Sequence, residues 1–345
     1  MALRQDENMP AGKIIFEGGG LYAGLKSRVG CSSLRGHRLI AILLVATAVV
    51  SLCWFVGCSR AATRADSQKS VRPPISYIGS WGMHGDGPGQ LDLPASIATD
   101  RVGDVYIPDA GSNFVHKFDR RGTPLLSFQY PGLTDPQSVA LDSGGAIYVT
   151  DSHRGSAFIF LPSGDRYREL HLNTRPKPDD ELGVAVGDDG VVHVLDPDAS
   201  RIFTYNSRFR LARAWSPVAG SPSDKVRASS IAVGPDGYLY MVDRAENRIL
   251  RFTEDGHFAG EFKCGANRRL SDQFALMRGF IFAMDADGRK LHVWSTDGQP
   301  KLDVDLAPEL GQANRPAPPI AVSVHKELLV LDAPEARVLR YQINF

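Results

Sequence analysis

An aspartate that ends a short apolar run recurs six times along the chain, at intervals of 42 to 47 residues. The six copies are Asp109, Asp151, Asp196, Asp243, Asp285 and Asp332. An aromatic side chain follows each aspartate nine residues later, from Phe118 in the first copy to Tyr341 in the last. A period of this length indicates one supersecondary unit repeated along the chain.

Each copy carries the signals of four short antiparallel strands. Two apolar runs flank a glycine turn, as in VGPDG at residues 233–237, and glycine supplies the positive φ that a tight hairpin needs. A third strand follows the aspartate, at residues 247–252 in the fourth copy, and a second Asp-Gly turn leads to the fourth strand. Many strand positions are apolar on both faces, as in a sheet packed between two neighbouring sheets. Each copy is therefore predicted to be one blade of a propeller.

The last copy ends at RVLRYQINF, after only three predicted strands. The missing fourth strand should resemble the tails of the other copies, and residues 75–82 (ISYIGSWG) do so immediately before the first copy. An amino-terminal strand that completes the last blade removes an open edge and closes the ring. The sequence thus predicts an all-β, six-bladed propeller over residues 75–345 with a monomeric body.

The repeats resemble the NHL family of propeller repeats. In that family a glycine-rich segment leads through Leu-Pro and an apolar strand to an aspartate, an Asn-Arg-Ile triplet and a final aromatic. Residues 79–119 follow this pattern, and IAVGPDGYLYMVDRAENRILRF at residues 231–252 matches it almost throughout. The resemblance covers residues 75–345 and implies the fold. It leaves the function open, because propellers are scaffolds for many activities.

The segment before the repeats has the features of a targeting region. Residues 39–56 contain no charged side chain and follow Arg35 and Arg38. Such a run is either the apolar part of a signal peptide or a membrane anchor. Residues 55–58 (FVGC) resemble a bacterial lipobox, in which Cys58 would be lipidated.

Two alternatives stay open for this segment, a lipoprotein and an uncleaved amino-terminal anchor. Residues 1–38 are then a signal n-region or a disordered cytoplasmic segment, residues 39–58 the signal or anchor, and residues 59–74 a flexible linker. The basic flank places the propeller outside the cytoplasm in both cases, on the cell membrane or the outer membrane.

The overall composition excludes several function classes. Lys plus Arg and Asp plus Glu number 39 each, which argues against nucleic acid as a partner. No nucleophile elbow, zincin motif or phosphate-binding loop occurs, and no cysteine–histidine set has metal-ligand spacing. We therefore expect no cofactor, no metal and no catalytic residue. The expected function is a non-catalytic, envelope-tethered propeller that binds a protein, peptide or glycan through its loops.

Loops that follow the repeated aspartates open on one face of such a ring, because every blade runs in the same direction. Their polar and basic residues are the predicted binding set for an acidic partner. This set is His153, Arg154, Arg201, Arg244, Asn247, Arg248, Lys290 and Arg337.

The alternative function is a metal-dependent propeller enzyme, such as a lactonase-like hydrolase or a lyase, that acts at the central channel. In that case charged residues at the starts of the innermost strands would form the channel rim. The positions concerned are Asp135, Asp180 and Arg227.

Overall fold

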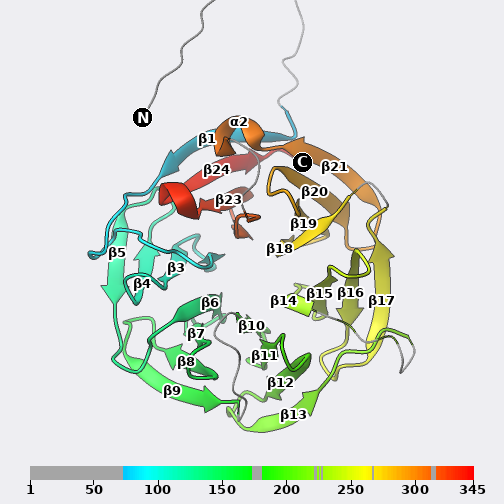
Figure 1. Ribbon diagram of the computed structural model, residues 1–345, viewed down its shortest axis with the longest axis horizontal. Helices are drawn as coiled ribbons and strands as arrows, with labels where there is room; N and C mark the ends of the chain where they lie inside the picture. The colour runs from blue at the N-terminus through cyan, green and yellow to red at the C-terminus, as the bar shows by residue number, and fades with distance from the viewer. Residues whose placement is uncertain are drawn as a thin grey trace, which may run out of the picture. The chain divides into compact units, whose positions relative to one another are not determined.

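The computed structural model describes residues 73–172, 181–220, 224, 226, 228–265, 268–311 and 316–345. Six four-stranded antiparallel sheets stand around a common axis as the blades of a propeller (Figure 1). The prediction of an all-β, six-bladed propeller is confirmed. Many strands are short because a glycine-containing turn ends them, as Gly237 does between the strand that ends at Val233 and the strand that begins at Leu239.

Blades 1 to 5 take their strands in sequence order. Blade 1 holds β2 (Ala98–Thr99), β3 (Val105–Asp109), β4 (Phe114–Phe118) and β5 (Pro124–Phe128). Blade 2 holds β6 (Pro136–Leu141), β7 (Ile147–Asp151), β8 (Ser156–Phe160) and β9 (Arg166–His171). Blade 3 holds β10 (Gly183–Val186), β11 (Val192–Asp196), β12 (Arg201–Tyr205) and β13 (Leu211–Trp215).

Blade 4 holds β14 (Ala228–Val233), β15 (Leu239–Asp243), β16 (Arg248–Phe252) and β17 (Phe258–Lys263). Blade 5 holds β18 (Leu270–Met277), β19 (Phe280–Asp285), β20 (Lys290–Ser295) and β21 (Pro300–Asp305). The helix α2 (Ala307–Leu310) leads to blade 6, in which the short 3-10 helix Ala333–Glu335 follows the second strand.

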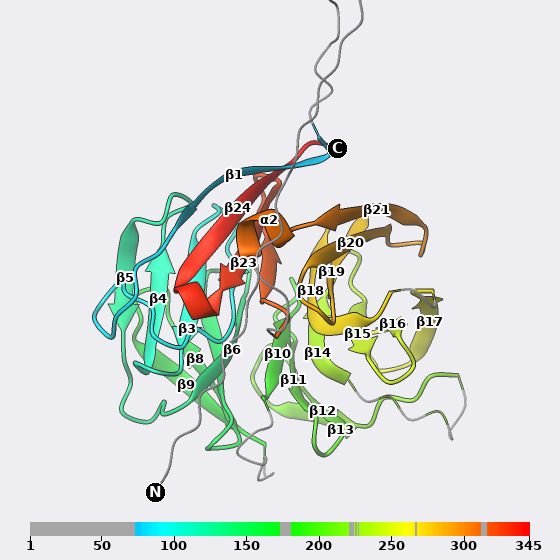
Figure 2. The same ribbon diagram turned by 45° about the horizontal axis from the view of Figure 1, so that its top comes forward.

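Blade 6 combines both ends of the described chain. It holds β22 (Ile320–Val322), β23 (Glu327–Asp332), β24 (Arg337–Ile343) and, as the outermost strand, β1 (Ile75–Trp81). Strand β1 runs antiparallel to β24 from the pair Ile75–Ile343 to the pair Trp81–Val338 (Figure 2). The predicted closure of the ring by an amino-terminal strand is confirmed.

The repeated aspartates tie the loops of a blade together. Asp109 is fully buried, and its carboxylate accepts hydrogen bonds from the backbone N–H groups of Asp92, Leu93, Gly111 and Ser112. Asp151 binds the backbone of Thr134, Asp135 and Arg154 in the same way. A buried carboxylate is stable when several N–H groups surround it. In these blades the aspartate therefore has a structural role.

Neighbouring blades lock through a glycine and an aromatic ring. Gly256 in the outer turn of blade 4 has φ +77°, and a Cβ there would lie 2.8 Å from the Trp215 ring of blade 3. The same contact joins Gly122 to Trp81 of β1, so the closing strand locks blade 6 to blade 1. Glycine is required at these turns for both its φ and its lack of a side chain.

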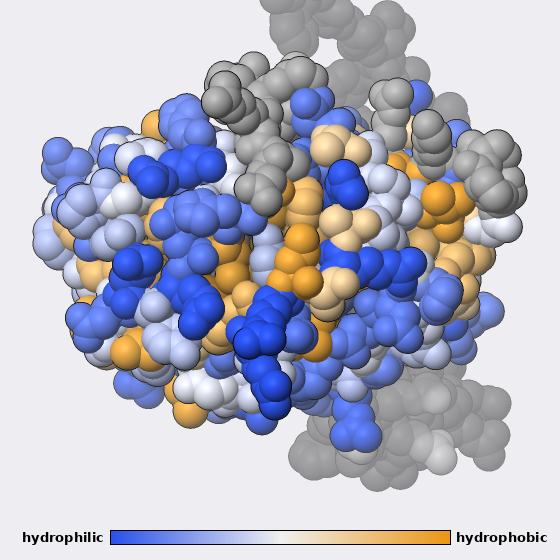
Figure 3. Space-filling model, turned by 90° about the horizontal axis from the view of Figure 1, so that it is seen from below, coloured by the Kyte–Doolittle hydropathy of each residue, from blue (hydrophilic) through white to orange (hydrophobic). Residues whose placement is uncertain are grey.

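The amino-terminal predictions, including lipidation of Cys58, lie outside the described residues. Within the described ranges, none of the helices has the length and hydropathy of a membrane-spanning segment. The outer side of the ring shown in Figure 3 carries hydrophobic patches between hydrophilic side chains. Exposed Leu125, Tyr167 and Leu211 lie on the outermost strands of blades 1 to 3.

Candidate functional site

The antiparallel strands sort the loops of the ring onto two faces. The six loops that follow the repeated aspartates open on one face, called here the aspartate face. The turns between the first and second strands of each blade, and between the third and fourth, open on the other face, called here the hairpin face. The starts of the innermost strands lie on the aspartate face. Asp135 is therefore on the same face as His153.

Arg248, a member of the predicted binding set, is buried in an ion-pair cluster. Its guanidinium lies 3.0 Å from Asp243, 2.6 Å from Asp224 and 2.7 Å from Glu261. Hydrogen bonds from Arg248 hold the pKa of Asp224 below its usual range, and those three carboxylates raise the pKa of Arg248 despite its burial. The structure gives Arg248 a structural role and no access to a partner.

Two further members of the predicted set are also engaged in the fold. Asn247 adopts a positive φ of 52°, and its side chain bonds the backbone of Gly265, Arg268 and Leu270. Arg337 pairs with Asp332 at 2.9 Å and donates to the Glu309 carbonyl. The remaining members are exposed: His153, Arg154, Arg201, Arg244 and Lys290.

Part of this exposed set is paired with nearby carboxylates. Arg244 lies 3.4 Å from Asp272, and Arg154 lies 3.9 Å from Glu169. The predicted rim residue Asp135 is 4.0 Å from His153, whereas Asp180 and Arg227 lie outside the described residues. The basic surface predicted for the aspartate face is thus largely neutralised where the structure describes it.

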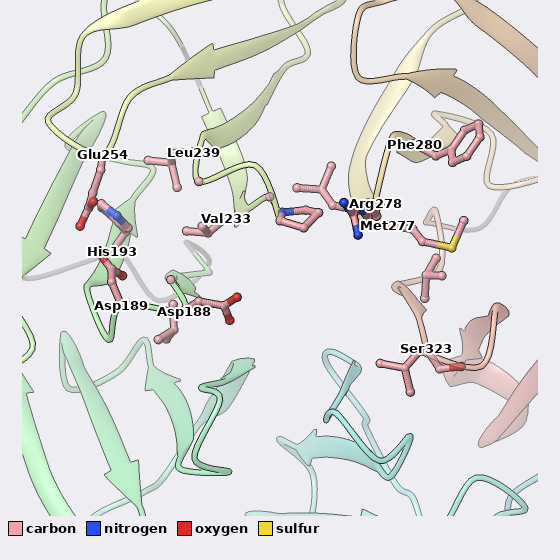
Figure 4. A pocket seen from close by; sticks show the side chains of 18 of the residues that line it. Asp188, Asp189, His193, Val233, Leu239, Glu254, Met277, Arg278, Phe280 and Ser323 are labelled. Atoms are coloured by element: carbon pink, nitrogen blue, oxygen red, sulfur yellow. The ribbon is translucent and has the colours of Figure 1, made fainter.

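A pocket of about 860 Å³ opens on the hairpin face near the ring axis. Its lining comes from the first hairpins of blades 3, 4, 5 and 6, together with the outer turn of blade 4 and Phe345. Figure 4 shows Asp188, Asp189, His193 and Glu254 on one side and Met277, Arg278 and Phe280 on the other. The volume falls in the range of sites for small organic ligands.

The wall formed by blades 3 and 4 is acidic. Asp188 and Asp189 belong to the hairpin between β10 and β11, and Glu254 belongs to the turn between β16 and β17. Partial desolvation, with a hydrogen bond and charge repulsion from Asp189, raises the pKa of Glu254 to about 7. Asp188 binds Arg101 of blade 1 at 2.7 Å. This wall therefore holds a carboxyl group, Glu254, whose pKa lies near neutral pH, beside two further carboxyl groups.

His193 lies in the same wall and is almost completely buried, with 1% exposure. Its Nδ1 lies 3.1 Å from the Thr204 hydroxyl, which accepts a hydrogen bond from Trp215 Nε1. Burial lowers the pKa of His193 to about 4, so the ring is neutral at pH 7. No described residue hydrogen-bonds to His193 Nε2.

The opposite wall, from blades 5 and 6, combines apolar and basic groups. The rings of Phe280 and Phe345 meet edge to face with centroids 5.0 Å apart. Lys326 donates to the Phe345 carbonyl oxygen at 2.9 Å. Arg278 sits in the tight turn between β18 and β19 and is exposed. The pocket thus has negative charge on one side and an arginine beside aromatic rings on the other.

None of these pocket residues stands out in the sequence as functional. The segment VGDDGV at residues 186–191 predicts a hairpin, and Asp188 and Asp189 are ordinary turn formers there. Glu254 stands in a similar Asp-Gly turn. These turns meet at one opening only because blades 3, 4 and 5 are neighbours in the folded ring.

The described residues contain no group of three or more His, Cys, Asp or Glu side chains arranged to hold a metal ion. Cys264 is free and buried, and burial raises the pKa of its thiol to about 12. This cysteine is an inert core residue.

Comparisons with known proteins agree with the fold. Residues 133–160 match the NHL repeat. Over 239 residues the chain is 25% identical to human (Homo sapiens) E3 ubiquitin-protein ligase TRIM32, covering 62% of this chain and 35% of that protein. The mouse (Mus musculus) protein of the same name is 24% identical over 257 residues, with 67% and 38% coverage. The chain thus spans little more than a third of these relatives.

Solved structures give the same result at lower sequence identity. A streptogramin B lyase superposes with a TM-score of 0.58 at 16% identity, covering 78% of this chain and 98% of the lyase. The virginiamycin B lyase from Staphylococcus aureus gives a TM-score of 0.55 at 14% identity, with 78% and 100% coverage. At these identities the likeness concerns the fold alone. The six observed blades make the chain a six-bladed β-propeller, and one segment of it, residues 133–160, matches the NHL repeat.

Proposed function

We propose that this protein is a ligand-binding propeller that holds its ligand, a peptide or a segment of a protein or glycan, in the pocket of the hairpin face. The observation that carries the proposal is the pocket itself, which four blades build from their hairpin turns and from the strand ends beside these turns. Turns can vary in side chain while the blades stay fixed, and binding surfaces of rigid scaffolds are usually built in this way.

The protein is also proposed to act outside the cytoplasm, tethered by its amino-terminal segment. The support is the uncharged run at residues 39–56, its basic flank and the Gly57-Cys58 pair. A tether of this kind would leave the propeller free to meet ligands in the envelope.

Catalysis is the second candidate function, and one observation favours it. A carboxyl group with a pKa of about 7 beside a neutral histidine is typical of general acid–base sites. The structurally similar lyases are enzymes, but they share only the fold. A stoichiometric divalent ion that chelation removes from the purified protein would favour the enzyme, with ligands outside the described residues.

A pocket-filling variant tests the binding proposal. Val324 lines the pocket and is 58% exposed, so Val324→Trp should fill the opening without disturbing the core. Leu125→Trp is the matched control, because Leu125 is 52% exposed on the outer strand β5.

Native mass spectrometry of the full chain, purified in detergent from its own envelope, is the measurement. The wild type and Leu125→Trp should carry a bound component that Val324→Trp lacks. A component retained equally by all three proteins would mean that the pocket is not its site.

A further inference from the structure

We propose that the pocket takes a short peptide with free ends, with its ammonium group against Asp189 and Glu254, an apolar side chain against Met277 and Phe280, and its carboxylate against Arg278. The inference rests on the proposed function, since it names the ligand class of the same pocket. It is carried by the opposed charges of the two walls.

The ammonium end is assigned from the acidic wall. Of its three carboxyl groups, Asp188 already pairs with Arg101. Asp189 and Glu254 form no ion pair with any basic residue that the structure describes, and the two carboxyl groups are close enough to interact. A cation between two neighbouring carboxyl groups relieves their repulsion. A ligand ammonium group supplies that cation.

His193 supports a polar ligand at the same wall. Its side chain is buried beside the carboxyl pair, and the Thr204 hydroxyl occupies only Nδ1. Because His193 lines the pocket and no described residue hydrogen-bonds to its Nε2, this nitrogen is open to a ligand. The peptide backbone of a ligand offers both donors and acceptors to such a nitrogen.

The carboxylate end is assigned from Arg278. Its guanidinium forms no ion pair or hydrogen bond with any described residue, whereas Lys326 beside it is bonded to Phe345. Guanidinium groups bind carboxylates with two parallel hydrogen bonds. Arg278 is thus the available cation of this wall, and it faces the pocket across from the acidic groups (Figure 4).

The apolar middle of the ligand is assigned from Leu276, Met277, Phe280 and Phe345 on the same wall. A neutral glycan would leave both charged walls unpaired, and a polyamine would leave Arg278 unpaired. A short peptide carries an ammonium group, a carboxylate and apolar side chains in one molecule. A short peptide is therefore the ligand class that can pair with the acidic wall, the apolar side chains and Arg278 together.

The charge balance makes binding depend on pH. Glu254 loses its proton as pH rises through about 7, so the wall becomes more negative and an ammonium group binds more tightly. His193 stays neutral over this range because its pKa is about 4. The other charged groups that line the pocket or face its acidic wall are Asp188, Asp189, Asp255, Arg101, Arg278 and Lys326.

The test uses the full chain and a positional library of tetrapeptides with free ends. The same library is also prepared with acetylated amines and, separately, with amidated carboxyl groups. Affinity-selection mass spectrometry at pH 7, where most peptide amines are protonated, measures retention. The wild type should retain free peptides about tenfold better than either capped form, the loss expected when one ion pair worth about 1.4 kcal/mol is removed.

Two variants assign the ends of the ligand. Glu254→Gln should abolish the preference for a free amine and leave the preference for a free carboxylate. Arg278→Gln should do the reverse. Retention by the wild type should fall between pH 7 and pH 5.5, where the peptide amine stays protonated, and it should be nearly flat in Glu254→Gln.

The outcomes separate this inference from the proposed function. Equal retention of free and capped peptides, or no retention at all, would overturn the peptide assignment. If Val324→Trp also abolishes retention of capped peptides, the pocket remains the binding site and only the ligand class is wrong. Retention of every form by Val324→Trp would overturn both.

Discussion

At the scale of single residues, burial decides what a charged side chain contributes. Arg248 is 6% exposed and touches three carboxylates, of which Asp243 is also buried. Arg201 stands at the same position of blade 3, five residues after its aspartate, but it is exposed at the start of β12. Removing one partner of a buried ion pair leaves an uncompensated charge, which is costly.

Arg248→Ala should therefore lower the free energy of unfolding by about 3 kcal/mol, because Asp243 would stay buried without its partner. Arg201→Ala is the matched control and should change it by no more than about 0.5 kcal/mol. Urea unfolding of both variants measures the difference. Equal effects of the two substitutions would show that the Arg248 cluster adds nothing to stability.

The sequence could not distinguish these two arginines. Asp224, which binds Arg248 at 2.6 Å, comes from the connection between blades 3 and 4, and Glu261 comes from the fourth strand of blade 4. Their convergence depends on how the blade folds. The pocket residues Asp188 and Glu254 could not be predicted either. Each is an ordinary turn residue in its own segment, and only the fold brings the two turns together.

At the scale of elements, the repeat determined most of what could be predicted. Strand order, the buried aspartates and the closing strand follow from a pattern repeated six times. The glycine–aromatic locks between blades were not predicted, because Gly256 and Trp215 lie in different copies. Their contact depends on the packing of one blade on the next.

The closing strand is the element with the clearest test. Ile75 of β1 is 6% exposed and belongs to the core between blades 5 and 6, whereas Ile78 of the same strand is 43% exposed. Ile75→Ala should destabilise the full chain by about 3 kcal/mol, the usual cost of a cavity left by isoleucine.

Ile78→Ala is the control for that substitution, and its effect should stay within about 0.5 kcal/mol. Thermal and urea unfolding of the two variants provide the comparison. If both variants were as stable as the wild type, β1 would not be part of the closed ring in solution.

At the scale of the whole molecule, the ring brings turns from four blades to one pocket, while the proposed tether fixes where that pocket works. The tether can be tested by itself. Cys58→Ser should abolish labelling by a fatty-acid analogue and leave a larger, membrane-held precursor. Labelling that survives the substitution would exclude lipidation at Cys58, and an uncleaved anchor would then be the better account.

Hydrogen exchange of the full chain, with and without the free tetrapeptide library, is the most direct test of whether the ligand binds in the pocket of the hairpin face. Exchange slows where a ligand covers backbone N–H groups or stabilises a turn. We expect slower exchange at the hairpin-face turns and no change in the loops of the aspartate face. The hairpin-face turns concerned are residues 187–191, 234–238, 253–257, 278–279 and 323–326. Slower exchange confined to the aspartate-face loops at residues 152–155, 197–200 and 244–247 would contradict this expectation.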